Sequence, residues 1–260
     1  MASIFAELQM ISQQNADSSI KRSREDLNAI VEVFKCRDTY LQEVTTFAQY
    51  IRHLDVQTLL DCDSFMVQPD VLINEIPREL QHDSLGFCKG VNLVFSGRYV
   101  YPVKDVKGDV MGFCGYDKFS DVKYLDSQNY GYKAKRFSCW GMEKLPEYYV
   151  STEPVFFVEG IVCALYLRQC GLQALALLGS SVSAYMLEII KRFGSRAIVI
   201  VDADEAGNKC RQNLKFRLPA VRVIQSRVAK DIDDSRMVEP NFVEELKKFK
   251  NPFYSSKLLK

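Results

Sequence analysis

The stretch SRAIVIVDADEAGNK, residues 195–209, joins a strongly apolar run to two closely spaced aspartates. Residues 197–202 are typical of a buried β-strand, and Asp202 and Asp204 lie at its end. Two like charges held close together are unfavourable unless a cation lies between them. An aspartate can also cap the helix that follows a strand, which accounts for one of the two residues more easily than for both. On this stretch alone, metal binding and helix capping are both open.

The composition of the whole chain is that of an ordinary water-soluble protein. Its 260 residues are 47% hydrophobic and 26% charged, enough for one or two domains with their own cores. The net charge of +1 argues against binding nucleic acid through overall charge, so any such contact should use a local patch or metal ions. No apolar run approaches membrane-spanning length, and MASIFAELQM lacks the pattern of a secretory signal, so we expect no membrane association.

Eight cysteines and two histidines occur, without paired spacings such as CxxC or HxxxH. A structural zinc site is therefore not expected. We expect free thiols in a reducing cytoplasm.

The first part of the chain, residues 1–150, is predicted to be an α+β subdomain. It begins with apolar residues at helical spacing, and short helices interrupted before Pro69 and Pro77 are expected over residues 58–80. Residues 92–125 contain short β-rich runs separated by Ser-Gly and Lys-Gly turns, which predict an antiparallel ribbon.

Residues 151–240 differ because strand-like and helix-like runs alternate. This alternation predicts an α/β domain with a mainly parallel sheet covered by helices. Residues 241–260 are expected to form a short helix and a lysine-bearing tail. In parallel sheets of this kind, functional sites form at the carboxyl ends of the strands.

Acidic residues follow three of the predicted strands. Glu159 follows the first, Asp202 and Asp204 follow the third, and KDIDD (230–234) follows the fourth. Capping explains each acid alone, but it does not favour all of them meeting at one edge of a sheet. Mg²⁺ prefers carboxylate oxygens and usually keeps waters for substrate phosphates, and paired ions can stabilise both oxygens of a phosphoryl transfer. The combined pattern favours a metal site.

Six motifs carry a resemblance to a known family. FFVEG, LLGSS and VIVDADEAG, in this order, resemble the TOPRIM fold shared by bacterial-type primases, topoisomerases and some nucleases. Upstream, GRYVYPVKDVKGDVMGFCGY is followed by KYLDS and YKAKRFSCWGM, which resemble the catalytic core of DnaG-type primases. The resemblance covers about residues 97–234, and the order of the motifs makes it more specific than a lone DxD.

The resemblance implies a catalytic site made of carboxylates. The implied catalytic residues are Glu159, Asp202 and Asp204. The implied ligands of Mg²⁺ or Mn²⁺, with two or more ions and no zinc, are Glu159, Asp202, Asp204, Asp231 and Asp233. Ile232 stands where the family usually has proline, so the loop is expected to be less rigid and Asp234 could substitute for Asp233.

Basic residues in the matched segments are implied to face template and nucleotide phosphates. They are Arg98, Lys123, Lys133, Lys135 and Arg136. Each could instead be an ordinary surface charge, and Lys133 or Arg136 could take the role of Lys135. Gly160 and Gly207 are expected to serve backbone geometry. The turn of residues 179–181 could approach the site or simply cap a helix.

The resemblance implies synthesis of short RNA primers on single-stranded DNA from nucleoside triphosphates, in the cytoplasm of a bacterium or a phage-infected host. A replicative helicase and a separate zinc-binding template reader are further candidate partners. The chain shows no zinc-ribbon pattern, long C-terminal region or GxxxxGK[ST] loop, which suggests a minimal core or one subunit of a split system.

Two other functions are open: a TOPRIM metal-dependent nuclease, and a non-catalytic module that binds single-stranded nucleic acid or a replication partner. The ribbon with KYLDS favours a primase over a nuclease. The intact Glu159, Asp202 and Asp204 argue against a purely binding role.

Overall fold

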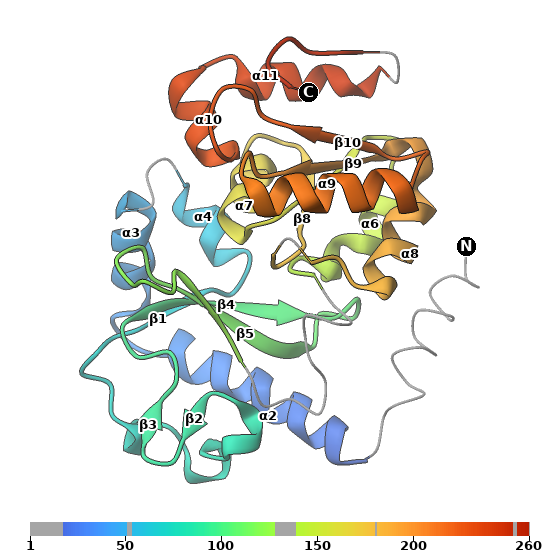
Figure 1. The fold of residues 1–260 in the computed structure, drawn as a ribbon. Helices are drawn as coiled ribbons and strands as arrows, with labels where there is room; N and C mark the ends of the chain where they lie inside the picture. Colours follow the sequence, from blue (N-terminus) through green and yellow to red (C-terminus); the bar gives the residue numbers. More distant parts are fainter. Residues whose placement is uncertain (1–17, 51–53, 128–138, 180, 252–253, 260) are drawn as a thin grey trace.

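Figure 1 shows the computed structural model of the chain, which describes residues 18–50, 54–127, 139–179, 181–251 and 254–259. The helices pack around two main sheets, a four-stranded antiparallel sheet and a four-stranded parallel sheet. The antiparallel sheet lies in the lower half of Figure 1, with one long helix beneath it, and the parallel sheet lies above it among helices.

The antiparallel sheet has the strand order β1-β4-β5-β6. Its strands are β1 (Phe65–Val67), β4 (Arg98–Lys104), β5 (Val110–Tyr116) and β6 (Tyr124–Asp126). The antiparallel pairing of β4 with β5 falls within residues 92–125, where a ribbon is predicted. The expectation of only short helices over residues 58–80 is wrong in one place, because Phe65–Val67 pairs with β4 as an edge strand. Single-turn helices do form at Ile73–Glu75 and Arg78–Leu80.

Helices cover both faces of this sheet. They are α2 (Ser18–Lys35), α3 (Tyr40–Tyr50) and α4 (Val56–Leu60). A separate small hairpin is formed by β2 (Cys88–Lys89) and β3 (Asn92–Leu93). Alternate residues of β4 face opposite sides, as the two-residue period of a strand requires. Val100 packs in the cluster that contains Phe34 of α2, whereas Tyr99 stacks on Phe47 of α3 with ring centroids 3.5 Å apart.

The parallel sheet has the order β10-β9-β7-β8, and all its pairs are parallel, as predicted. Its strands are β7 (Val155–Val158), β8 (Gln173–Ala176), β9 (Ala197–Val201) and β10 (Arg222–Gln225). The helices around it are α6 (Leu145–Val150), α7 (Ile161–Gln169), α8 (Ala184–Phe193), α9 (Glu205–Arg217), α10 (Ile232–Val238) and α11 (Phe242–Lys247). Every residue of β7 and β9 is buried because helices pack on both faces.

One hydrophobic cluster runs from the antiparallel sheet into the parallel one. It includes Phe47 of α3, Tyr101 of β4, Trp140, and Phe156 of β7. Trp140 also pairs its backbone with Ala176 at the edge of the parallel sheet. In the described ranges no helix is long and apolar enough to cross a membrane, and all eight cysteines are free thiols.

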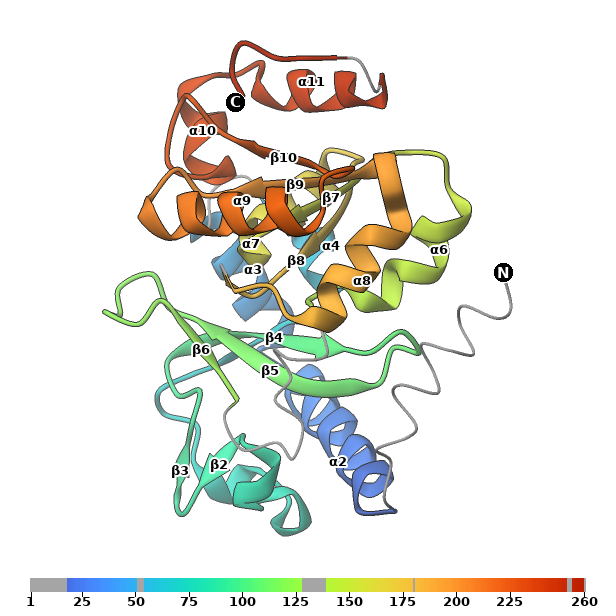
Figure 2. The ribbon, with the colours of Figure 1, turned by 45° about the vertical axis from the view of Figure 1, so that its right-hand side comes forward.

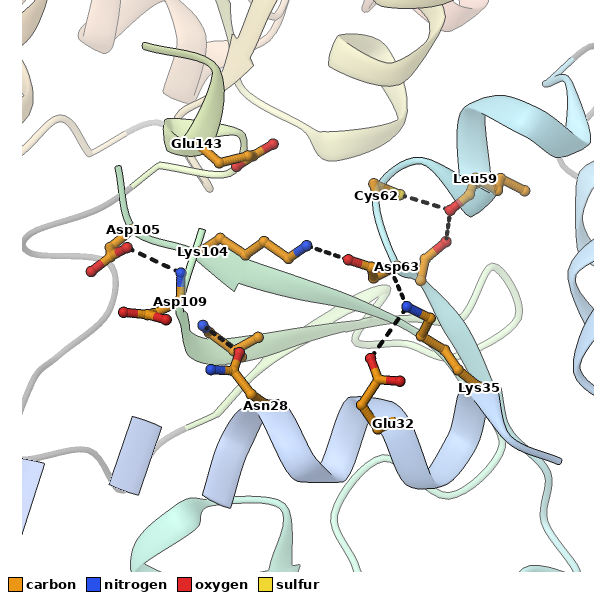
Figure 3. Close-up of polar contacts among 12 residues, drawn as sticks. Asn28, Glu32, Lys35, Leu59, Cys62, Asp63, Lys104, Asp105, Asp109 and Glu143 are labelled. Atoms are coloured by element: carbon orange, nitrogen blue, oxygen red, sulfur yellow. Dashed lines mark hydrogen bonds and ion pairs between the residues drawn. The ribbon is translucent and has the colours of Figure 1, made fainter. Parts of the chain in front are cut away.

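Asp63 links three separate segments of the antiparallel half (Figure 3). Its carboxylate accepts a hydrogen bond from Lys35 of α2 at 2.6 Å and another from Lys104 at the end of β4. Burial acts to raise the pKa of Asp63, but the two lysines together lower it below its ordinary value. The backbone of Asp63 has φ of 54°, a left-handed conformation that Asp and Asn tolerate better than most residues.

We predict that Asp63→Asn lowers the free energy of unfolding by about 1–3 kcal/mol at neutral pH, because two partly buried lysines lose their common counter-ion. Asparagine keeps the left-handed backbone accessible, so the loss reports the charge. Because the pKa of Asp63 is lowered in the folded state, its contribution is present above the ordinary value of 3.8 and is lost as the pH falls below it. Urea unfolding at pH 7 and pH 3.5 measures both effects.

Glu32→Gln is the matched control, since Glu32 also contacts Lys35, at 3.2 Å, but is 63% exposed. It should cost less than about 0.5 kcal/mol. Equal losses for the two variants would show that Asp63 has no special role.

Candidate active site

The carboxyl end of the parallel sheet brings acidic residues from different strands together. Glu159 follows β7 and Asp202 follows β9, and the two strands are neighbours. The backbone N–H of Asp202 donates a hydrogen bond to Oε1 of Glu159 at 3.0 Å. Both residues and Asp231 line a cavity of about 270 Å³, which we call the carboxylate cavity. Its other walls include Tyr124 of β6 and Cys163 of α7.

The two aspartates of the DAD motif have different environments. Asp204 is the N-cap of α9, where Oδ1 accepts from the backbone N–H of Gly207 at 2.9 Å, and Oδ2 lies 3.2 Å from Nζ of Lys230. The backbone hydrogen bond to Gly207, followed by the pairing with Lys230, lowers the pKa of Asp204. Capping thus accounts for Asp204 and leaves Asp202 unexplained.

Asp202 is half-buried at the centre of the acidic group. Burial, followed by the negative charges of Glu159 and Asp231, raises the pKa of Asp202 to about 7. Burial also raises the pKa of Glu159, with the charge of Asp204 acting in the same direction. Without a nearby cation, these carboxylates therefore bind protons more readily than ordinary ones. Lys230 opposes the shift of Asp202 only in part.

The KDIDD segment contributes Asp231 to the cavity and directs Asp233 elsewhere. Asp231 is the N-cap of α10, where Oδ1 accepts from the backbone N–H of Asp234 at 2.8 Å. Burial raises the pKa of Asp231. Oδ1 of Asp233 accepts from Nε of Arg236 at 2.9 Å. Ile232, at the position of the usual proline, is buried, and the backbone of this turn is held by hydrogen bonds to Asp231.

Gly207 is required by a close backbone approach. A Cβ atom at this position would lie 2.0 Å from the carbonyl oxygen of Asp202, so any side chain would push the first turn of α9 away from the end of β9. At Gly160, an added Cβ would meet only the hydroxyl of Tyr124, at 3.5 Å. The backbone N–H of Gly179 donates to the carbonyl of Glu159. Of these three glycines, Gly207 most clearly fixes the geometry of the acidic residues.

The acidic residues fit an open cation site. Within the part of the chain that the structure describes, no group of three or more His, Cys, Asp or Glu side chains is arranged to hold a metal ion by itself. Mg²⁺ does not need such a group, because it usually keeps several waters and binds one or two carboxylates together with substrate phosphates. The pKa values of Asp202 and Glu159 are raised mainly by burial and further by neighbouring carboxylates, so a bound cation would favour their ionised forms.

The predicted basic residues have different positions. Arg98 donates to the carbonyl of Val122 at 2.9 Å and to Oγ of Ser120 at 3.0 Å, so it braces the loop between β5 and β6. Lys123 is exposed at the end of this loop, next to Tyr124, which lines the carboxylate cavity. The predictions for Lys133, Lys135, Arg136 and Ser180 lie outside the described residues.

Three residues near the site were not assigned roles from the sequence. Lys230 pairs with Asp204, Tyr124 forms a wall of the cavity, and the buried Gln225 donates to the carbonyl of Asp202 at 2.6 Å. Lys230 lies within KDIDD and Tyr124 lies within KYLDS, so the matched motifs themselves could have identified both residues. Nothing in the sequence marks Gln225 among other polar residues at strand ends.

Part of the chain is similar in sequence to known proteins. Residues 156–235 match a family model described as Toprim-like. The DNA primase of Borreliella burgdorferi is 33% identical over 119 residues, which are 45% of this chain and 23% of that protein. The chain thus spans about a quarter of the length of curated relatives that it matches.

Solved primase structures share the fold. The structure of a DnaG primase catalytic domain bound to ssDNA has a TM-score of 0.73 at 18% identity, covering 90% of this chain and 79% of that one. The zinc-binding and RNA polymerase domains of Aquifex aeolicus primase give a TM-score of 0.70 at 21% identity, covering 92% and 62%. The chain therefore has the fold of a DnaG-type primase catalytic core, with a Toprim-like domain over residues 156–235.

Proposed function

We propose that this chain synthesises short RNA primers on single-stranded DNA by metal-dependent phosphoryl transfer. The observation that carries the proposal is the convergence of Glu159, Asp202 and Asp231 on one cavity, with Asp204 beside them, at the carboxyl end of the Toprim-like sheet. The sequence relationship to bacterial DNA primases and the shared fold of the catalytic core support the same reaction.

In this reaction the 3′-hydroxyl of one nucleotide attacks the α-phosphate of the next, and pyrophosphate leaves. Glu159, Asp202, Asp204 and Asp231 would hold Mg²⁺ or Mn²⁺, which when bound offsets phosphate charge and aligns the reacting oxygens. Asp202 would bind as the carboxylate, so the proton favoured by its raised pKa must leave. Lys230 lies 57% exposed beside Asp204 and can move from that carboxylate to a phosphate of the incoming nucleotide.

Arg98 and Lys123 would act on the nucleic acid in different ways. Arg98 is bound to the β5–β6 loop, so we infer that it positions this loop. Lys123 is exposed on the same loop and is free to approach a phosphate of the template or nucleotide. A replicative helicase and a separate zinc-binding template reader stay candidate partners of this core.

We predict that the double variant Asp202→Ala/Asp204→Ala loses primer synthesis by at least about a hundredfold, because the developing phosphate charge loses its compensation. The assay incubates the protein with single-stranded DNA, labelled nucleoside triphosphates and Mg²⁺ or Mn²⁺, and separates the products on a gel. Labelled oligomers that depend on the two aspartates support primer synthesis.

Glu244→Ala serves as the control, since Glu244 is a surface carboxylate, 61% exposed, that pairs with Lys247 on α11. It should leave synthesis unchanged. DNA that becomes shorter without new oligomers would assign the site to a nuclease. If neither product forms after a helicase and a zinc-binding partner are added, the chain is not a primase.

We also predict that Mn²⁺ binding in the absence of nucleotide weakens about tenfold between pH 8 and pH 6, because Asp202, with a pKa of about 7, must lose its proton to bind. Asp202→Asn should bind weakly and remove this pH dependence. Lys230→Met should move the midpoint to higher pH, because Lys230 lowers the pKa of Asp202. Titration followed by Mn²⁺ electron paramagnetic resonance measures all three. A wild-type Mn²⁺ affinity that does not change with pH would contradict the assignment of Asp202 as a metal ligand that must lose its proton.

A further inference from the structure

A second cavity, of about 560 Å³, lies beside the β5–β6 loop and is lined by neither Glu159 nor any of the site aspartates. Aromatic rings from α3, β4, β5 and the β5–β6 loop form much of its wall, and we call it the aromatic pocket. The rings belong to Phe47, Tyr50, Tyr99, Tyr116 and Phe119. Its volume is within the range of about 300–1,000 Å³ that is typical of small-molecule sites.

The aromatic pocket adjoins the carboxylate cavity through a pair of tyrosines. Tyr116 lines the aromatic pocket and Tyr124 lines the carboxylate cavity, and their ring centroids are 5.0 Å apart. From Tyr116 the ring contacts pass through the buried Phe47, at 6.1 Å, to Tyr50, which lies 6.3 Å from Phe47 and 5.5 Å from Phe119. These rings form a continuous series from the rim of the aromatic pocket to the edge of the acidic site.

Phe119 is the outermost ring and is 82% exposed. It lies on the loop that extends from the rest of the molecule at the left of Figure 2. Hydrogen bonds brace the loop: the backbone N–H of Phe119 donates to Oδ1 of Asp117 at 2.9 Å, and Arg98 donates to Val122 and Ser120. A phenylalanine held in water by a braced loop gains most from an apolar or π-stacked partner.

Two lysines flank this ring on a loop that also carries Asp117 and Asp121. Lys118 and Lys123 are both exposed on the same loop, and Nζ of Lys118 lies 5.5 Å from the ring centroid of Tyr50. Proteins that bind single strands combine stacking rings with basic residues that follow the phosphates. Two residues that line the pocket have buried polar atoms, the Tyr50 hydroxyl and Nε of Arg37, without a hydrogen-bond partner within the described ranges. Such groups can bind the polar edge of a base.

We propose that the aromatic pocket stacks bases of the single-stranded template, with Phe119 as the outer ring and Lys118 and Lys123 near the phosphates. This inference rests on the proposed function and adds the path of the template toward the carboxylate cavity. Stacking on aromatic rings accepts any base, so the subsite holds the strand without selecting its sequence.

The test measures binding of a labelled 20-nucleotide thymidine oligomer by fluorescence anisotropy in EDTA, which separates strand binding from catalysis. Phe119→Ala should weaken binding about fivefold to a hundredfold, as expected for loss of one stacked base. Phe119→Trp should bind at least as tightly as the wild type. Phe216→Ala, on α9, is the matched control, since Phe216 is also exposed, at 88%, and it should bind as the wild type does.

A second measurement reports contact directly. An oligomer containing 5-iododeoxyuridine, irradiated in the complex, should form a cross-link that peptide mass spectrometry assigns to Phe119 or Tyr50. The inference is overturned if Phe119→Ala binds the oligomer as the wild type does, or if cross-links form only elsewhere. It is also overturned if Phe119→Ala weakens binding of labelled ATP alone, which would assign the pocket to a nucleotide. If one of these results is obtained and the wild type still synthesises primers, the stacking inference fails but the proposed function of primer synthesis does not.

Discussion

The burial of several carboxylates side by side at the carboxyl end of the parallel sheet, where they also repel one another, is the constraint on which the candidate site depends. Glu159, Asp202 and Asp231 face one cavity, and the pKa of Asp202 rises to about 7. A fold selected for stability alone would separate such groups or pair each with a cation. Here the neighbouring backbone is fixed instead: Gly207 packs against the carbonyl of Asp202, and Gln225 donates to the same carbonyl. These backbone contacts keep Asp202 beside Glu159 and Asp231 despite the unfavourable proximity of their charges.

The two aspartates of the DAD motif, Asp202 and Asp204, lie in different environments. Asp204 caps α9 and pairs with Lys230, so a structural explanation suffices for it in the absence of ligands. Asp202 makes no such contact and has the more perturbed pKa. The same division holds in the KDIDD segment, where Asp231 faces the cavity and Asp233 binds Arg236. Arg236 in turn lies over the ring of Tyr166, 4.2 Å from its centroid, which fixes the direction of Asp233. Sequence spacing cannot show which acid of a pair turns inward.

Most of the fold could be predicted because local patterns and long-range packing agree. The strands of the parallel sheet are short apolar runs, and the turn between β4 and β5 contains Lys107-Gly108. The edge strand β1 was missed, because three residues, Phe65–Val67, are too few to show a period. They become a strand only through pairing with β4. The aromatic pocket could not be predicted either. Its rings come from segments that are far apart in the sequence, and only the packing of α3 beside β5 brings them together.

The hydrophobic cluster around Trp140 has a consequence for the architecture of the chain. A change in sequence pattern near residue 151 suggests two modules, yet Tyr101 of β4 and Phe156 of β7 lie in the same buried cluster. Trp140 is 2% exposed, and Arg168 of α7 lies 4.5 Å above its ring. A fragment that begins at residue 151 would expose the surface that Tyr101 and Trp140 now cover. The carboxylate cavity has walls from both halves, with Tyr124 on one side and Glu159 on the other, so the buried cluster that joins the halves also holds these walls together.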